Sequence, residues 1–353
     1  MNKGEWSELY TFLRLLADGK VYAADADLNK IEDLYYPIIK IIRQSKTHKE
    51  PLFYEFDDKQ IIILSSENKN PIKQIPTEKF TLNANKLLER IKKATVSSFE
   101  VPEVSSFILE IESRSVKEKS SSKRDITIII HDTNTGRKPE VGFSVKSKLG
   151  GASTLFNAHV TNNMQYKIEG VEELDREVLE SLKPLKAKTL LKGIRENNCK
   201  IVFESVVNSN FESNLYMIDS NFPAILAEIL KLYYSGHSIK IKDLTEKVTE
   251  INPCGFRDNE TFPFYKYKIR GFLTACALGM TSKKPWNGSF DVSGGYIVVK
   301  ENGDILCYHL YNWEDFQEYL FNSTFIDTPS TTRHKFGKLE GDKLKLNFQI
   351  RFN

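Results

Sequence analysis

The chain has 353 residues, 40% of them hydrophobic and 27% charged, and a formal net charge of +3 at pH 7. This composition suits a globular protein with a sizeable core, and no run approaches the roughly eighteen apolar residues of a membrane span. The N-terminal MNKGEWSELY lacks the apolar stretch of a signal peptide. Four scattered cysteines without a C-x-x-C pair, and six scattered histidines, indicate neither a disulfide framework nor a zinc site. We therefore expect a cytoplasmic protein without a membrane partner.

The pattern of apolar residues predicts a mixed α/β chain without internal repeats. In chain order, we expect a helix at 3–17, a helix at 28–44, a strand at 60–65, a helix at 86–93 and a strand at 105–112. A Ser/Lys-rich loop at 113–124 is expected to be disordered, and strands at 125–131 and 141–148 flank a turn at 134–136. Helices are expected at 153–166, 175–195, 223–234 and 242–250, and strands at 295–300, 305–309 and 344–351.

The two strands around the turn at 134–136 bring polar residues together. In a two-stranded hairpin the numbers of opposed residues have a constant sum, which places Asp125 opposite Ser144 and Lys123 opposite Lys146. Alternation then puts Asp125, Ser144 and Lys146 on one face, and the other face carries Ile126, Ile128, Ile130, Phe143 and Val145. A metal-dependent phosphodiesterase needs such a face, because the carboxylate holds Mg²⁺ and the lysine orients the attacking water. The alternative is an ordinary half-buried hairpin whose polar face meets water.

The N-terminal helix adds two carboxylates. Its apolar stripe consists of Trp6, Leu9, Phe12, Leu13 and Leu16. Glu5 projects into this stripe and Glu8 lies at its edge, where a carboxylate is costly unless it is paired or binds metal. The alternative for Glu5 is a favourable interaction with the helix dipole in the first turn. That alternative gives Glu8 no role.

Several segments resemble the HpaII-type restriction endonucleases, which cut DNA at CCGG. They are NKGEWSELY at 2–10, LADGKVYAADADLNKIED at 16–33, GFSVKSKLGGASTLFNA at 142–158, GGYIVVKENGDILCYHLYN at 294–312, DTPSTTRHKFG at 327–337 and the closing LNFQIRF. The helix glutamate, the hairpin aspartate and the S-x-K segment resemble the PD-(D/E)XK nuclease core. The resemblance implies an α/β fold with a central mixed β-sheet flanked by helices, and additional helical and C-terminal β elements. We expect a catalytic core at 1–170 and a DNA-recognition region at 171–353, or one domain that contains both.

The resemblance assigns chemistry residue by residue. Asp125 matches the family's metal-binding aspartate and Lys146 its lysine, while Ser144 stands where the general motif has a second acid. No Asp or Glu occurs between Lys146 and Glu169, so the second carboxylate must come from elsewhere in the chain. Glu5 and Glu8 are both candidates to bind Mg²⁺ together with Asp125. Glu140 is a weaker candidate.

Three polar segments are candidates for contact with DNA. After the Gly150-Gly151 turn come Ser153, Thr154, Asn157, Asn162 and Asn163, where Asn suits base edges and Ser or Thr suits phosphates. In the second segment Arg333 is expected to read a guanine through its O6 and N7 atoms, beside Thr332, His334 and Lys335. The third, 261–290, has five basic residues and no acidic one, and we expect phosphate contacts from Lys266, Lys268 and Arg270. The stretch 181–200 is also basic, with six Lys or Arg against one Glu. The alternatives are helix capping, a structural turn and solvated lysines.

The predicted function is that of a type II restriction endonuclease, which hydrolyses phosphodiester bonds of double-stranded DNA with Mg²⁺ at a short palindrome, CCGG. A palindromic target favours a homodimer or a dimer formed on DNA, and a cognate DNA methyltransferase is expected in the host. Two alternatives stay open. One is a DNA-binding protein without catalysis, in which Asp125 and Lys146 form a surface ion pair, and the other is a structure-specific repair nuclease.

Overall fold

The fold is described from a computed structural model. The described residues are 1–43, 48–65, 71–113, 124–133 and 135–353. Most of the predicted Ser/Lys-rich loop, and Asn134 of the predicted turn, lie outside this set. The chain forms two compact units, one of residues 1–153 and 291–319, the other of residues 154–290 and 320–353. Within the described residues, no helix has the length and apolar character needed to cross a membrane.

The first unit is built on a nine-stranded sheet in the order β1-β12-β11-β7-β6-β2-β3-β4-β5. Its strands are β1 (Lys20–Ala24), β2 (Lys30–Arg43), β3 (Leu52–Asp57), β4 (Gln60–Ser65), β5 (Pro71–Pro76), β6 (Ile126–Ile130), β7 (Glu140–Ser147), β11 (Gly295–Val299) and β12 (Ile305–His309). Strand β1 pairs with β2 as well as with β12, so six strands from β1 to β2 close into a barrel. The pairs β11–β7 and β1–β12 are parallel and the other pairs are antiparallel, which makes the sheet mixed.

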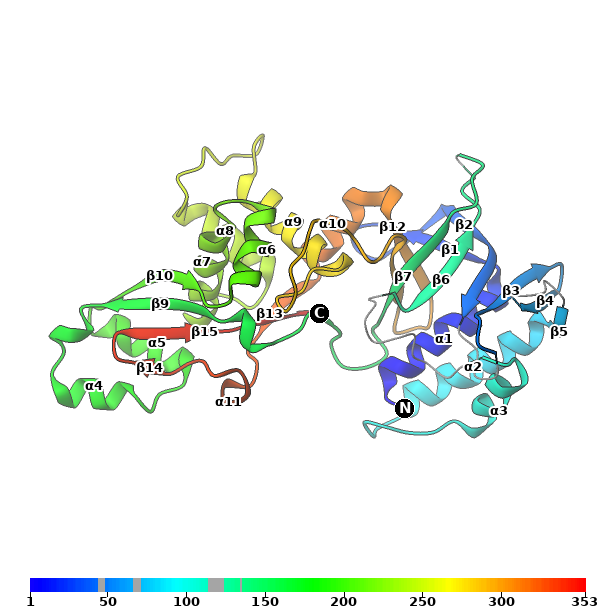
Figure 1. Cartoon of the computed structure of the whole chain (residues 1–353), viewed down its shortest axis with the longest axis horizontal. Coiled ribbons are helices and arrows are strands. Elements are labelled where there is room, and N and C mark those ends of the chain that lie inside the picture. The colour runs from blue at the N-terminus through cyan, green and yellow to red at the C-terminus, as the bar shows by residue number, and fades with distance from the viewer. Residues whose placement is uncertain (44–47, 66–70, 114–123, 134) are drawn as a thin grey trace. The chain divides into compact units, whose positions relative to one another are not determined.

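Three helices lie against the sheet of this unit: α1 (Lys3–Asp18), α2 (Thr77–Lys93) and α3 (Pro102–Glu110). A capping box at Asn2 begins α1, and Gly19, with a left-handed backbone, ends it. Its apolar stripe is buried among residues of the sheet and of the other two helices, with Phe12, Leu13 and Leu16 fully enclosed. Figure 1 shows α1 and α2 side by side. This packing fixes the position of α1 next to β7.

The second unit contains a four-stranded sheet, β10-β9-β15-β14, and a three-stranded sheet, β13-β16-β8. These strands are β8 (Thr154–Phe156), β9 (Met164–Glu169), β10 (Lys200–Val206), β13 (Thr324–Asp327), β14 (Leu339–Glu340), β15 (Lys343–Leu346) and β16 (Gln349–Phe352). The helices are α4 (Arg176–Leu182), α5 (Ala187–Glu196), α6 (Ser209–Ile218), α7 (Phe222–Tyr234), α8 (Ile241–Ile251), α9 (Phe264–Leu278) and α11 (Thr331–His334). A further helix, α10 (Trp313–Asn322), contains the boundary between the units at residue 319.

The mixed α/β class and the sheet flanked by helices are confirmed. So are the first helix, the strands at 60–65 and 305–309, and both hairpin strands to within two residues. Three predicted elements are wrong. Residues 28–44 contain the strand β2, residues 105–112 lie largely in the helix α3, and residues 153–166 contain β8 and the start of β9. The predicted helix at 175–195 is two helices separated around Pro184, and the predicted last strand is two strands.

The segment 291–319, which the sequence analysis placed in the second region, belongs to the first unit. It contains β11 and β12, which fill the place in the sheet between β7 and β1. Strand β11 is parallel to β7, with Tyr296 beside Ser144 and Val298 beside Lys146. The C-terminal half of the chain therefore supplies neighbours to the hairpin of β6 and β7.

A substitution of Gly295, at the start of β11, tests the close pairing of β11 with β12. Its φ is 102°, and a Cβ atom there would lie 2.0 Å from the backbone oxygen of Tyr308 in β12. We expect Gly295→Ala to lower the free energy of unfolding by more than about 2 kcal/mol, because the barrel must shift to relieve both strain and overlap. Gly151→Ala is the control, since its Cβ would meet nothing within 4 Å. Thermal unfolding of both variants measures the difference, and equal stability would contradict the close β11–β12 pairing.

Candidate active site

The hairpin of β6 and β7 has the register expected from its sequence. Ile126 pairs with Phe143 and Ile128 with Val141, so opposed residue numbers have the same sum as Asp125 and Ser144. The expected apolar face is buried, with Ile128, Ile130 and Phe143 fully enclosed. Helix α1 is in contact with β7, so it lies next to this hairpin.

Asp125 is held firmly just before β6. Its backbone N–H donates to the oxygen of Phe143 at 2.9 Å. Its carboxylate oxygen Oδ2 accepts hydrogen bonds from the Val145 N–H at 2.7 Å and from the Ser144 hydroxyl at 3.0 Å. No hydrogen bond from the described residues reaches Oδ1. One oxygen thus fixes the orientation of the carboxylate and the other is available to a ligand.

Ser144 has a different role from the acid whose place it takes. It is 4% exposed and its hydroxyl donates to Asp125. A hydroxyl supplies no negative charge for a cation, so its effect is to position Asp125.

Lys146 lies two residues farther along β7 and is half-buried. Burial lowers the pKa of its ammonium, while the nearby carboxylates of Asp125 and Glu8 raise it. Its Nζ atom is 5.4 Å from the ring centre of Tyr296 on the parallel strand β11. No ion pair joins Lys146 to Asp125, although both residues are described. The two charged groups lie near enough to affect each other without a direct ion pair.

Glu8 is brought to this environment by α1. Its pKa is raised to about 7, first by burial and then by repulsion from Asp125, against the attraction of Arg43 and Lys146. The carboxylate of Glu8 makes no hydrogen bond to the described part of the chain. A half-buried carboxylate beside a second carboxylate is costly without a cation.

Glu5 is engaged at the start of the helix. Its backbone N–H donates to the Asn2 side chain at 2.9 Å, and its Oε2 atom accepts from the Asn2 N–H at 3.0 Å. This capping box matches the structural alternative for Glu5. Glu140, at the exposed start of β7, is six residues from Lys146 along an extended strand. Of the three candidates, the structure places Glu8 best to share a ligand with Asp125.

A cavity of about 230 Å³ opens at this point of the first unit. It is lined by Lys3, Gly4, Ser7, Glu8, Val145, Lys146, Ser147, Gly150, Gly151 and Ser153. The predicted Gly150-Gly151 turn therefore forms part of its wall. Ser153 lies beside it, where its hydroxyl donates to the oxygen of Ser147 at 3.2 Å. Glu8 and Lys146 thus line the same cavity.

Two residues of the site were missed by sequence reasoning. Arg43, 8% exposed at the end of β2, lies 4.5 Å from the ring centre of Phe12 and is the cation with the largest effect on Glu8. Arg43 was missed because residues 28–44 were expected to form a helix, whereas Arg43 ends the strand β2. Tyr296 was missed because the parallel pairing of β11 with β7 has no local signal in the sequence.

The residues suit a hard cation with few protein ligands. No group of three or more His, Cys, Asp or Glu side chains is arranged to hold a metal among the described residues. Mg²⁺ binds through one or two carboxylates and retains several waters. The open Oδ1 of Asp125 and the unbonded carboxylate of Glu8 fit that requirement.

Apart from Ser153, which lines the cavity of the first unit, the candidates for DNA contact are dispersed over the second unit. Asn162 and Asn163 are buried, and their amides donate to backbone oxygens of Phe348 and His334, respectively, at 3.0 Å each. Neither amide reaches the surface, which removes both from the base-reading set. The helix expected there is absent because the segment folds as β8 and β9. Asn157 is exposed, and Thr154 pairs with Arg351.

The basic candidates differ in their surroundings. On α9, Lys268 pairs with Asp219 and Lys266 lies over the ring of Phe321 at 5.3 Å, while Arg270 is half-buried. On and after α11, Thr332, Arg333 and Lys335 are exposed, whereas His334 is buried and its oxygen accepts the Asn163 amide. The segment at 331–335 is therefore the more accessible of the two.

Comparison with known proteins covers nearly the whole chain. The family model described as HpaII restriction endonuclease matches residues 2–352. The type II restriction enzyme HpaII of Haemophilus parainfluenzae is 39% identical over 356 aligned residues, which cover 99% of this chain and 98% of the relative. No solved structure matches. The extent of both matches establishes that the chain belongs to the HpaII restriction endonuclease family.

Proposed function

We propose that the chain is a type II restriction endonuclease that hydrolyses double-stranded DNA at CCGG with Mg²⁺. The observation that carries this proposal is that Glu8 and Lys146 line one cavity and that Asp125 lies near enough to affect the pKa of both, without a direct ion pair among these three described residues. Membership of the HpaII family supports it, as does the similarity to a type II restriction enzyme. The proposal includes CCGG as the target, Mg²⁺ as the metal and a protein dimer on DNA.

The site is a variant of the PD-(D/E)XK arrangement in this proposal. Asp125 is the aspartate, Lys146 is the lysine, and Ser144 replaces the second acid of the strand. Glu8, from the helix packed against that strand, restores the missing carboxylate. Asp125 and Glu8 would hold Mg²⁺, which when bound offsets negative charge on the phosphate and lowers the pKa of water.

The chain's own residues supply the remaining steps. Ser144 and the Val145 N–H keep the Asp125 carboxylate in place before DNA arrives. The lowered pKa of Lys146 increases the share of neutral amine, which accepts a proton at Nζ from the water that attacks phosphorus. The bond from phosphorus to the leaving oxygen then breaks, and a proton from solvent neutralises that oxygen.

A plasmid assay with three variants tests the proposal. With Mg²⁺, the protein should cut a plasmid into the fragments set by its CCGG sites, and EDTA should stop cleavage. Asp125→Ala and Lys146→Ala should reduce the rate at least about a thousandfold with little change in folding, because each removes transition-state stabilisation. Ser144→Ala should retain measurable activity, since the Val145 N–H still holds Asp125.

The contrary outcomes of this assay are distinct. A smear of fragments would indicate a nuclease without site specificity, and intact plasmid with a gel shift would indicate a DNA-binding protein. Substantial cleavage by Asp125→Ala or Lys146→Ala would refute the assigned site.

The pH dependence of stability tests the environment of Glu8. The pKa of Glu8 is about 7 in the folded chain, against an ordinary value of 4.5 for a glutamate, so the folded state holds this proton more tightly. In EDTA, the free energy of unfolding should therefore gain a component that falls as pH rises from about 4.5 to about 7, by at most about 1.4 kcal/mol per pH unit. Glu8→Gln removes the titrating group and should remove this component. Denaturant unfolding across that range measures it, and the same pH slope in both proteins would show that Glu8 is not in the assigned environment.

A further inference from the structure

A second, larger cavity lies in the second unit and is surrounded by lysines. It has a volume of about 550 Å³ and is enclosed by two segments that are far apart in the sequence. One is the α4–α5 connection, and the other runs from α11 to β15. Its lining residues are Lys183, Pro184, Leu185, Lys186, Thr331, Thr332, Lys335, Phe336, Gly337, Lys338, Glu340 and Lys345. We call this cavity the lysine-lined hollow.

The lysine-lined hollow has an excess of positive charge. Its lining contains five lysines and one acid, Glu340, which pairs with Lys345 at 3.6 Å. Lys183 pairs with Glu180, whereas Lys186, Lys335 and Lys338 have no acidic partner among the described residues. Like charges gathered at one place favour binding of an anion.

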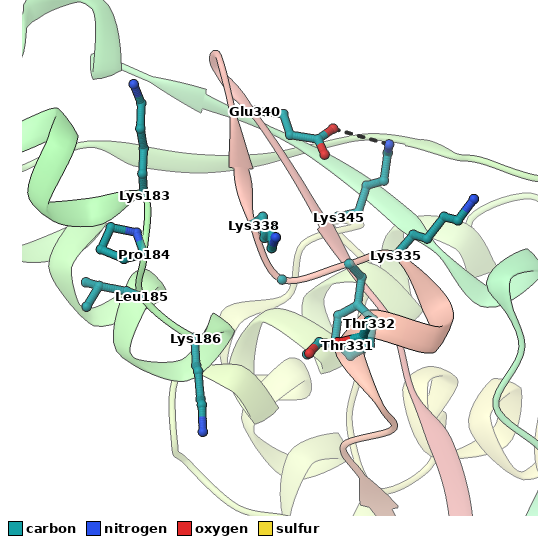
Figure 2. Close-up of a pocket in the computed structure, with 12 residues that line it drawn as sticks. Lys183, Pro184, Leu185, Lys186, Thr331, Thr332, Lys335, Lys338, Glu340 and Lys345 are labelled. Carbon is teal, nitrogen blue, oxygen red and sulfur yellow. Dashed lines mark ion pairs between the residues drawn. The ribbon is translucent and has the colours of Figure 1, made fainter.

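The distribution of these lysines favours an extended anion. Figure 2 shows the two segments on either side of the hollow, with the amines of Lys183, Lys186 and Lys335 spread in different directions around it. A small anion would contact only a part of this set. A chain of phosphates, such as one strand of a duplex, can contact several amines in turn.

The lining chemistry favours phosphate over base. Lysine is a point charge without the planar fork that reads guanine, and the exposed hydroxyls of Thr331 and Thr332 suit phosphate oxygens. The aromatic residue of the lining, Phe336, is only 4% exposed and offers little surface on which a nucleobase could stack.

The backbone of the hollow adds donors. Helix α5 begins at Ala187, without a side-chain cap and without an acidic residue in its first turn. Gly337, with φ of 79°, lies against this helix start, and a Cβ atom there would be 3.3 Å from the Cβ of Ala187. The start of α5 thus lies beside a residue that lines the hollow, and the positive end of its helix dipole adds to the potential of the lysines.

We propose that the lysine-lined hollow binds backbone phosphates of duplex DNA, independently of base sequence. This inference rests on the proposed function and gives the basic stretch 181–200 a role beside the segment at 331–335. It separates phosphate contacts, made by Lys186, Lys335 and Lys338, from guanine reading by the neighbouring Arg333, which does not line the hollow.

The test compares two double variants of equal charge. Lys186→Ala/Lys338→Ala removes two exposed lysines of the hollow, and Lys240→Ala/Lys242→Ala removes two exposed lysines of the same unit outside it. Binding is titrated with Ca²⁺ in place of Mg²⁺, on a CCGG duplex and a scrambled duplex of equal length, at several salt concentrations. Arg333→Ala is measured in parallel.

The hollow variant should bind both duplexes more weakly than the unaltered protein does. The loss of affinity should be equal for the two, about 10- to 60-fold near 0.1 M salt. The slope of log affinity against log salt should fall by about two units, because two phosphate contacts and their counterion release are lost. The control variant should bind as the unaltered protein does. Arg333→Ala should weaken binding to the CCGG duplex more than binding to the scrambled duplex.

Three results would overturn the inference. The first is a hollow variant that binds both duplexes as the control variant does. The second is a loss of affinity for the CCGG duplex alone. The third is that pyrophosphate raises the melting temperature of the unaltered protein and not of the hollow variant, while both bind DNA equally. If the unaltered protein cuts at CCGG, any of these results refutes phosphate binding by the hollow and leaves the proposed function intact. If it neither cuts nor binds DNA, the proposed function fails and the inference fails with it.

Discussion

The candidate site depends on the packing of α1 against the barrel, which holds two carboxylates near each other. The buried stripe of α1, including Phe12, Leu13 and Leu16, fixes the helix next to β7. That position buries Glu8 and brings it close to Asp125, and burial first and then repulsion from Asp125 raise the pKa of Glu8 to about 7. Hydrophobic burial thus stabilises an arrangement of charges that is unfavourable alone. A divalent cation is the ligand that would relieve this repulsion.

Local patterns in the sequence were enough to predict the hairpin and the first helix. Residue alternation along the two strands set their faces, and the turn set the register. Asp125, Ser144 and Lys146 could therefore be placed together before their surroundings were known. Glu8 was found by its position at the edge of an apolar stripe, although the sequence did not distinguish it from Glu5. The structure distinguishes them, because the carboxylate of Glu5 is engaged in a capping box with Asn2.

The rest of the fold depended on contacts between distant segments. Residues 30–43 form one long strand because β1, β3 and β6 all pair with it, and that pairing overrides the apolar spacing that suggested a helix. The same reason explains the failure at 153–166, where β16 and β10 complete the pairing of β8 and β9. Asn162 and Asn163 looked like base readers because an exposed helix was expected. The lysine-lined hollow likewise joins segments about 150 residues apart, which composition alone marked only as basic.

Metal binding by two matched variants tests the account most directly. Titration calorimetry with Mn²⁺ at pH 8 would compare Glu8→Gln with Glu5→Gln, two substitutions of the same chemistry one helical turn apart on α1. The account predicts that Glu8→Gln weakens Mn²⁺ binding at least about tenfold, because one of two carboxylate ligands is lost. Glu5→Gln should bind Mn²⁺ as the unaltered protein does. Loss of binding in Glu5→Gln with binding retained in Glu8→Gln would contradict the assignment of the second carboxylate.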